Sequence, residues 1–195
     1  HEIEPNSLAV NFIENKSNIF IKNLEIASHV ANDIFNDSNF PNLNGDLLIN
    51  CLESFKMPPG RGEIFSLNKF KIIDDSYNAN PESVKAALDH LSGFQECRKF
   101  FVFGDMKELG ANEEILHKKV GQYAVGKTDI LLTVGKLAKN AQSNSNNFAL
   151  SLHFNDNFSL LEKLNELLTD GDIVLIKGSR SMQLDQLINE LKNVK

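Results

Sequence analysis

The sequence predicts an α/β fold, a doubly wound and mostly parallel sheet, over its last two thirds. From about residue 62 onward, short apolar segments alternate with amphipathic segments of helical period. Strands that are apolar throughout are typical of parallel sheets covered by helices on both faces. In such sheets, ligands bind beyond the carboxyl ends of the strands. We therefore expect the functional residues in the loops that follow the strands.

Five buried strands are expected in this region. They are the runs FKIIDD (70–75), KFFVFG (99–104), DILLTVG (129–135), FALSLHF (148–154) and DIVLIKG (172–178). Apolar runs of this length, bounded by polar residues or glycine, are consistent with strands buried on both faces.

Helices are expected at 81–94, 112–125, 135–142, 156–169 and 181–194. The first is the most clearly marked, since Asn80 can cap its amino end and Pro81 suits the first helical position. Apolar spacing predicts which residues face the core: Val84, Ala87, Leu88 and Leu91; Leu116, Val120 and Tyr123; Phe158, Leu161, Leu164 and Leu168; Leu184, Leu187, Ile188 and Leu191.

The first 60 residues follow a different pattern. Two apolar runs at 8–13 and 18–24 could form a hairpin, and helical patterns follow near 24–36 and 45–55. KMPPGRG (56–62) is rich in Pro and Gly and is typical of a linker. We expect residues 1–60 to be the tail of another domain with its linker, and residues 61–195 to be the α/β domain. A chain that begins at His1 without Met is expected to be a fragment.

Composition narrows the possible functions. The net charge of −6 argues against broad electrostatic binding of nucleic acid, which needs a basic face. A nucleotide can still bind, because backbone amides and a few cations suffice for it. The two cysteines are far apart, no apolar run approaches the roughly 20 residues that span a bilayer, and the first residues do not resemble a signal peptide. We expect a cytoplasmic protein without membrane insertion and without a zinc site.

GQYAVGKT (121–128) fits the phosphate-loop pattern G-x-x-x-x-G-K-[ST]. A working phosphate loop follows a strand and opens a helix, so that its amides point at the phosphates. Here the order is reversed, because the motif ends one expected helix and leads into the strand 129–135. We interpret it as a helix end in which Gly126 adopts a left-handed conformation and Lys127 lies at the helix carboxyl terminus.

Three other strings lie at expected strand ends, where a ligand would bind. IIDDSYNANPES (72–83) places two carboxylates before a helix amino terminus, which favours anions. FGDMKELG (103–110) carries Asp105, Lys107 and Glu108 after a glycine turn and could face a ligand or only solvent. IKGSRSM (176–182) offers two cations and two hydroxyls at a helix start, which suits a carboxylate or phosphate or makes a polar turn.

Taken together, these strings resemble the Mur ligases. DDSYNANPESVKAAL, GDMKELG, His117 with Gly121, and VLIKGSRSM occur in the order found in the carboxy-terminal part of that family, and PPGRGE (58–63) resembles its interdomain segment. The resemblance covers about residues 56–194 and is greatest to the members that add D-alanyl-D-alanine. Residues 1–55 match only loosely, as the end of a central ATPase domain.

The resemblance implies an ATP-dependent amide ligase of peptidoglycan precursor synthesis. In this family, ATP phosphorylates the carboxylate of UDP-N-acetylmuramoyl tripeptide, and the amine of D-alanyl-D-alanine attacks the acyl phosphate. The phosphate loop and the Mg²⁺ ligands belong to the other domains of the family, so the isolated chain is expected to be inactive. We expect small-molecule substrates, no nucleic acid and a monomer.

The resemblance also assigns residues to two subsites. Arg61 and Asp75 match the residues that contact the nucleotide, and Asn78 and Asn80 belong to the same motif. The side of the incoming dipeptide is matched by Lys177, Ser179, Arg180, Asp105 and Glu108. His117 matches a family position, where it packs or caps. No catalytic residue and no metal ligand is expected in this chain.

Two alternatives stay open on the sequence. A folylpolyglutamate synthase-like ligase shares the architecture, but this chain has NANP where that group has an HNP-type motif. A phosphoryl-receiver module would use Asp74, Asp75, Asp105 and Lys177 as an acidic magnesium pocket. Asp105, however, ends the second expected strand, whereas the phosphoacceptor of a receiver ends the third.

Overall fold

A computed structural model of the chain describes residues 26–27, 29–30, 33 and 58–193. The chain divides into two compact units, His1–Met57 and Pro58–Lys195. The described residues of the first unit are helical, within the stretch where the sequence predicts a helix near 24–36. The hairpin predicted at 8–24 and the helix near 45–55 lie outside the described residues. The domain boundary predicted after residue 60 stays a prediction.

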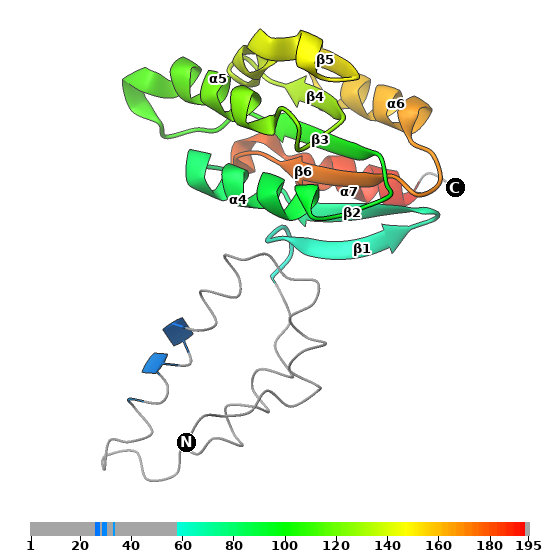
Figure 1. The fold of residues 1–195 in the computed structure, drawn as a ribbon, viewed down its shortest axis with the longest axis horizontal. Coiled ribbons are helices and arrows are strands. Elements are labelled where there is room, and N and C mark those ends of the chain that lie inside the picture. The colour runs from blue at the N-terminus through cyan, green and yellow to red at the C-terminus, as the bar shows by residue number, and fades with distance from the viewer. Residues whose placement is uncertain (1–25, 28, 31–32, 34–57, 194–195) are drawn as a thin grey trace. The chain divides into compact units, whose positions relative to one another are not determined.

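The second unit is built on a six-stranded sheet (Figure 1). Its strands are β1 (Glu63–Leu67), β2 (Phe70–Asp75), β3 (Lys99–Gly104), β4 (Ile130–Val134), β5 (Leu150–Phe154) and β6 (Ile173–Lys177). They lie in the order β1-β2-β6-β3-β4-β5, and all neighbours are parallel except β1 with β2. The predicted α/β fold with a mostly parallel sheet is confirmed.

Helices cover both faces of this sheet. They are α4 (Pro81–Ser92), α5 (Glu113–Ala124), α6 (Asn157–Leu167) and α7 (Leu184–Asn193), with the 3₁₀ helix η2 (Ala138–Asn147). Along β3, Phe101 and Phe103 join the buried cluster under α4, α5 and η2, whereas Phe100 and Val102 join the cluster under α6 and α7. This alternation is the ordinary period of a strand, and here both of its faces meet helices.

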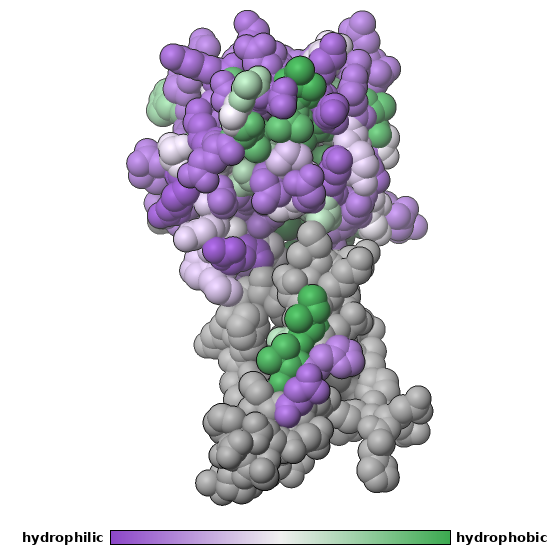
Figure 2. Space-filling view, turned by 90° about the vertical axis from the view of Figure 1, so that its left-hand side faces the viewer, coloured by the Kyte–Doolittle hydropathy of each residue, from purple (hydrophilic) through white to green (hydrophobic). Residues whose placement is uncertain are grey.

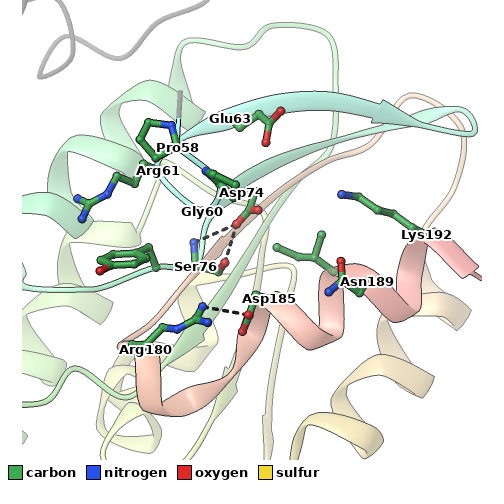
Figure 3. Close-up of a pocket in the computed structure, with 13 residues that line it drawn as sticks. Pro58, Gly60, Arg61, Glu63, Asp74, Ser76, Arg180, Asp185, Asn189 and Lys192 are labelled. Carbon is green, nitrogen blue, oxygen red and sulfur yellow. Dashed lines mark hydrogen bonds and ion pairs between the residues drawn. The ribbon is translucent and has the colours of Figure 1, made fainter. Parts of the chain in front are cut away.

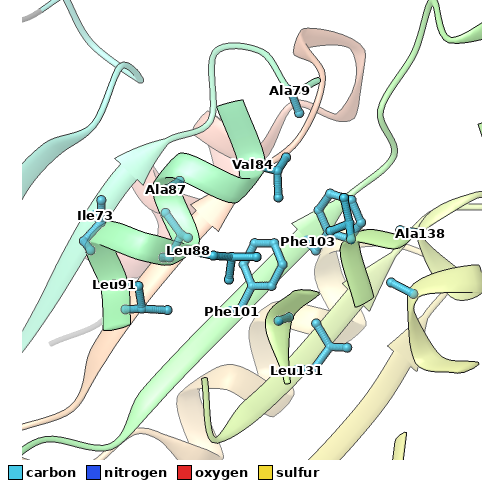
Figure 4. Packing of buried hydrophobic residues seen from close by; sticks show 14 of the residues in the cluster. Ile73, Ala79, Val84, Ala87, Leu88, Leu91, Phe101, Phe103, Leu131 and Ala138 are labelled. Carbon is cyan, nitrogen blue, oxygen red and sulfur yellow. The ribbon is translucent and has the colours of Figure 1, made fainter. Parts of the chain in front are cut away.

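The amino end of α4 follows from its sequence. The Asn80 side chain accepts a hydrogen bond from the Ser83 amide at 2.8 Å, and the Asn80 amide donates to the Ser83 hydroxyl at 3.1 Å. This reciprocal pair is a capping box, and Pro81 occupies the first helical position. The apolar face of α4 then packs on β3, where Leu88 lies beside Phe101 (Figure 4). All four residues predicted for this face are buried.

The buried face of α5 differs from the predicted one. Leu116 and Tyr123 are only partly buried, and the residues that are buried are His117, Val120, Gly121 and Ala124. The cause is a close approach of η2, since a Cβ atom at Gly121 would collide with the backbone of Ala141. The prediction was based on the large apolar residues, whereas the contact between α5 and η2 depends on the small residue Gly121.

The prediction for α6 was also wrong at one end. Leu164 is buried as expected, but Leu160 takes the other inward position and Phe158 is 70% exposed. Asp156 caps this helix by accepting from the Ser159 amide at 2.8 Å, which places Phe158 in the first turn.

Two further elements were not predicted. β1 pairs with β2 as a hairpin whose turn contains Asn68 in a left-handed conformation, with φ of 53°. Near the carboxyl end, the helix expected from residue 181 begins later. A 3₁₀ turn, η3 (Arg180–Met182), and a left-handed Gln183 precede α7. The predicted core face of α7 is buried in full.

Candidate functional site

The carboxyl ends of the five parallel strands meet at one edge of the sheet, here called the carboxyl edge, which faces the viewer in Figure 2. The linker reaches this edge too, because β1 is antiparallel and Glu63 pairs with Asp74 near the end of β2. Figure 2 shows a mostly hydrophilic surface. In the described part of the second unit, the exposed large apolar residues all follow strand ends: Tyr77, Ile115 and Phe158.

Asp75 and Lys177 form an ion pair at the carboxyl edge. They are opposite each other in the register of β2 and β6. Lys177 Nζ donates to Asp75 Oδ2 at 2.6 Å and to the carbonyl oxygen of Asn78 at 2.9 Å. The Lys177 side chain is only 2% exposed. Burial lowers its pKa, while the Asp75 carboxylate opposes that shift and the Arg61 charge adds to it.

This pair joins two residues that the sequence assigned to different subsites. Asp75 was expected beside the nucleotide and Lys177 beside the dipeptide. The ammonium of Lys177 is engaged within the domain, where it fixes the Asp75 carboxylate and the backbone at Asn78. The Asp75 side chain remains 22% exposed, so a ligand at the edge can still reach it.

Asn78 and Asn80 serve the same loop. Asn78 Oδ1 accepts from the Ala79 amide at 2.8 Å. Asn80 uses its side-chain oxygen for the cap of α4. Asn80 therefore orients the loop after β2, and the exposed side chain of Asn78 extends from it.

A groove of about 740 Å³ opens on the other side of β2, between the linker and α7 (Figure 3). Asp74 lies in its wall and not Asp75, because successive strand residues point to opposite faces. Asp74 Oδ1 accepts from the amide and the hydroxyl of Ser76, at 3.1 and 2.6 Å. The basic residues of the groove are Arg61, Arg180 and Lys192.

Tyr77 brings two of these cations together. The guanidinium carbon of Arg61 lies 4.1 Å from the centre of the Tyr77 ring, and that of Arg180 lies 6.0 Å from it. Arg180 also pairs with Asp185 at 2.9 Å. Arg61 and Arg180 were assigned to separate subsites, yet both line this groove. The Tyr77 amide donates to the carbonyl oxygen of Gly60 at 3.0 Å, which ties the linker to the end of β2.

Asp105 is buried and organises the loops after β3 and β4. Its Oδ1 accepts from the amides of Leu137 and Ala138, both at 2.8 Å, at the start of η2. Its Oδ2 pairs with Lys107 at 2.9 Å. Burial raises the pKa of Asp105, but these hydrogen bonds and the Lys107 charge outweigh burial and hold it below the ordinary value.

Ser179 links the loop after β6 to the loop after β3. Its amide donates to the carbonyl oxygen of Asp105 at 2.9 Å, and its hydroxyl accepts from the Lys107 amide at 2.8 Å. Ser179 is 4% exposed. Asp105 and Ser179, which the sequence assigned to one subsite, therefore lie together. Both are buried and hydrogen-bonded to the backbone of neighbouring loops.

His117 of α5 contacts the loop after β3, and Glu108 belongs to that loop. His117 is fully buried and accepts from the Met106 amide through Nε2 at 2.8 Å. Glu108 is exposed and has φ of 63°, a left-handed conformation that is uncommon for a residue with a side chain. The sequence assigned Glu108 to the dipeptide side and gave His117 no defined role. The position of His117 in a helical pattern did not reveal that its side chain contacts the loop after β3.

GQYAVGKT lies at the opposite edge of the sheet. It ends α5, and Gly126 has φ of 76° where the chain turns toward β4. Lys127 Nζ pairs with Asp89 Oδ1 at 2.6 Å and lies 4.7 Å from the centre of the Tyr123 ring. Tyr123 also donates to Asp89, at 2.9 Å. The predicted helix end is confirmed, and the lysine joins α5 to α4.

Among residues 26–27, 29–30, 33 and 58–193, no group of three or more His, Cys, Asp or Glu residues could hold a metal ion. In the same described residues, no helix has the length and apolar character needed to cross a membrane.

The strand order argues against the receiver alternative. Receivers have the flavodoxin-like order 2-1-3-4-5. Here the last strand, β6, lies between the first two parallel strands, β2 and β3. The Asp105 carboxylate, which would accept the phosphoryl group, is already bonded to two amides and Lys107.

Comparison with known proteins shows which family this chain resembles. The family model for the Mur ligase, glutamate ligase domain, matches residues 60–180. A UDP-N-acetylmuramoyl-tripeptide–D-alanyl-D-alanine ligase of Bacillus subtilis is 38% identical over 128 residues, which are 62% of this chain and 27% of that protein. The enzyme of the same name from Rickettsia prowazekii is 32% identical over 140 residues, 71% of this chain and 31% of that protein.

Solved structures give the same result. A MurF ligase from Thermotoga maritima in complex with ADP superposes with a TM-score of 0.65 at 26% identity, covering 74% of this chain and 33% of that one. A MurF from Acinetobacter baumannii gives 0.69 at 26% identity, covering 77% and 34%. The chain spans about a third of the length of these relatives. By the family model over residues 60–180, by these relatives and by its fold, the chain belongs to the Mur ligase family.

Proposed function

We propose that this chain is the carboxy-terminal part of an ATP-dependent ligase that adds D-alanyl-D-alanine to UDP-N-acetylmuramoyl tripeptide. The observation that carries the proposal is the meeting of all the assigned residues at one edge of the sheet. Relatives named for that reaction match this chain at 29–38% identity. The folylpolyglutamate synthase from Thermotoga maritima matches at 17% identity, which supports only the shared fold.

The nucleotide end of the site would use Arg61 and Asp75. Asp75 presents a carboxylate that can accept from ribose hydroxyls, and Lys177 holds it in place. Arg61 lies in the linker and stacks on Tyr77, and its guanidinium would meet a phosphate of the nucleotide. The MurF ligase from Thermotoga maritima, a structural neighbour, was solved in complex with ADP, which supports a nucleotide as a ligand of the complete ligase. The phosphate loop and the Mg²⁺ ligands would belong to the remainder of the ligase.

The dipeptide end would use the loops after β3 and β6. Arg180 at the start of η3 can hold a carboxylate, although it shares its charge with Asp185. Glu108 extends from the loop that Asp105 and Ser179 organise. The exposed apolar residues of the carboxyl edge support closure of another domain over it, which would exclude water from the acyl phosphate.

Phosphate release by the complete ligase tests this proposal. Release is expected only when ATP, the UDP-muramoyl tripeptide and D-alanyl-D-alanine are all present. The 195-residue chain alone is expected to release none. Release that depends on glutamate and a folate, and not on the dipeptide, would instead establish the folylpolyglutamate synthase-like alternative.

A further inference from the structure

The loop from Asp105 to Gly110 is held at the carboxyl edge by contacts from three other elements. The Lys107 amide donates a hydrogen bond to the Ser179 hydroxyl. The Asp105 carboxylate accepts hydrogen bonds from the two amides at the start of η2. Between these two anchors, the Met106 amide is bonded to His117 of α5 at 2.8 Å. Met106 itself is fully buried, so its amide has no access to water in the folded domain.

The geometry fixes the protonation of His117. Its Nδ1 lies 2.6 Å from the carbonyl oxygen of Glu113, which can only accept, so Nδ1 carries a proton. Its Nε2 accepts a hydrogen bond from the Met106 amide, so Nε2 carries no proton of its own. His117 is therefore a neutral imidazole with both nitrogens committed to backbone groups. A protonated imidazole has no acceptor to offer Met106.

The backbone that His117 holds is strained two residues further on. Glu108 has φ of 63° and Gly110 has φ of 64°. Left-handed backbone at a residue other than glycine is strained and persists only where neighbouring contacts enforce it. The side chain of Glu108 is exposed at the carboxyl edge. The anchors at Met106 and Lys107 therefore determine where this carboxylate is presented.

We propose that His117 is a positioning residue for the dipeptide subsite: its neutral imidazole fixes the backbone at Met106 and thereby sets the position of Glu108. This rests on the proposed function, in which the loop after β3 faces D-alanyl-D-alanine. His117 touches no substrate and acts only through the loop.

Two measurements test this proposal. The first is hydrogen exchange of the Met106 amide in the 195-residue chain, which needs no ligase activity. The second is the KM of the complete ligase for D-alanyl-D-alanine and for ATP. His117→Leu, which fills the space but accepts no hydrogen bond, is expected to speed Met106 exchange and raise the dipeptide KM about tenfold or more, with the ATP KM within about twofold. His117→Gln, whose amide oxygen can replace Nε2, is expected to restore both within about threefold.

His90 supplies the matched control. It is half-buried near the carboxyl end of α4, at the opposite edge of the sheet, where its ring lies 5.4 Å from that of Phe94. His90→Leu and His90→Gln are expected to leave the dipeptide KM and the exchange of the Met106 amide unchanged. If His117→Leu does not fold, His117→Asn, whose shorter side chain cannot reach Met106, takes its place.

Two results would overturn the proposal. One is a folded His117→Leu whose Met106 amide exchanges as slowly as in the wild type. The other is faster exchange with an unchanged dipeptide KM. If the wild-type ligase does not use D-alanyl-D-alanine, the proposed function fails and the dipeptide role of His117 fails with it. The exchange rates would still show separately whether His117 holds the loop.

Discussion

At the scale of single residues, Asp75 and Lys177 form one ion pair, although the sequence assigned them to different subsites. The sequence correctly placed each at a strand end, and the family resemblance gave each a ligand. It did not reveal that β2 and β6 are neighbours, because the chain between them forms three other strands. A residue pair separated by 102 positions is determined by strand order, and strand order is not encoded in local pattern.

Their coupling can be measured by a double-mutant cycle. Lys177→Met and Asp75→Asn are each expected to destabilise the chain, Lys177→Met by about 1.5–3 kcal/mol because a buried charged hydrogen bond is lost. The double variant is expected to lose less than the sum, with a coupling of about 1 kcal/mol or more. Urea denaturation of the four proteins gives the values. Additive losses would mean that the two side chains are not energetically coupled.

Lys127 is expected to contribute much less to stability than Lys177. Its partner Asp89 is 46% exposed, and exposed ion pairs contribute about 0.2–1 kcal/mol. Lys127→Ala is therefore expected to lower stability by less than about 1 kcal/mol and to leave the kcat and both KM values of the complete ligase nearly unchanged. Steady-state kinetics and urea denaturation check the two parts. A large fall in kcat would restore GQYAVGKT as a functional loop.

At the scale of elements, the sequence predicted existence and order better than contact faces. The five parallel strands and their helices appeared as clean alternations, because three of the strands, β3, β4 and β6, are buried along nearly their whole length. The inward face of α5 was misassigned because Gly121 and His117 carry no hydrophobic signal. β1 was missed because its burial is only partial and its pairing depends on a left-handed Asn68.

The two glycines of GQYAVGKT test the account of α5. Gly121→Ala would push a methyl group into the backbone of Ala141, and overpacking of this kind costs about 1–3 kcal/mol or more. Gly126→Ala has open space around it and meets only the strain of its left-handed conformation, about 1 kcal/mol. Thermal unfolding is expected to show the larger loss for Gly121→Ala. Equal losses would argue against close packing of α5 on η2.

At the scale of the whole molecule, buried histidines link stability to pH. Burial lowers the pKa of His117, whose surroundings include Glu113 of α5 and Asp105 and Lys107 of the loop after β3. The Glu113 carbonyl and the Asp105 and Glu113 charges oppose that shift, and the Lys107 charge adds to it. The neutral form is thus favoured in the folded state, while the unfolded histidine binds its proton near pH 6.5. Its contribution to stability is full above about pH 6.5 and decreases as the pH falls toward the folded pKa.

The variant His117→Gln isolates this effect, since burial also lowers the pKa of His90 and His153. The free energy of unfolding of the wild type relative to this variant is expected to decrease between about pH 7 and pH 5.5. Urea denaturation at both pH values measures it. A difference that does not change with pH would mean that His117 has the same pKa in both states.

The candidate site as a whole was partly predictable. Strand-end strings located the carboxyl edge, and the family resemblance named most of its residues. Tyr77, which gathers Arg61 and Arg180, was not singled out, because only the fold brings the linker and η3 to the end of β2. The groove beside Asp74 was missed for the same reason.

The central claim is that the nucleotide is bound from the carboxyl edge and not at the phosphate-loop match. The most direct measurement is the ATP KM of the complete ligase carrying Asp75→Ala or Lys127→Ala, with thermal unfolding to confirm that both variants fold. Asp75→Ala is expected to raise the ATP KM about tenfold or more, and Lys127→Ala to leave it within about twofold. An unchanged KM in Asp75→Ala together with a large rise in Lys127→Ala would contradict the account.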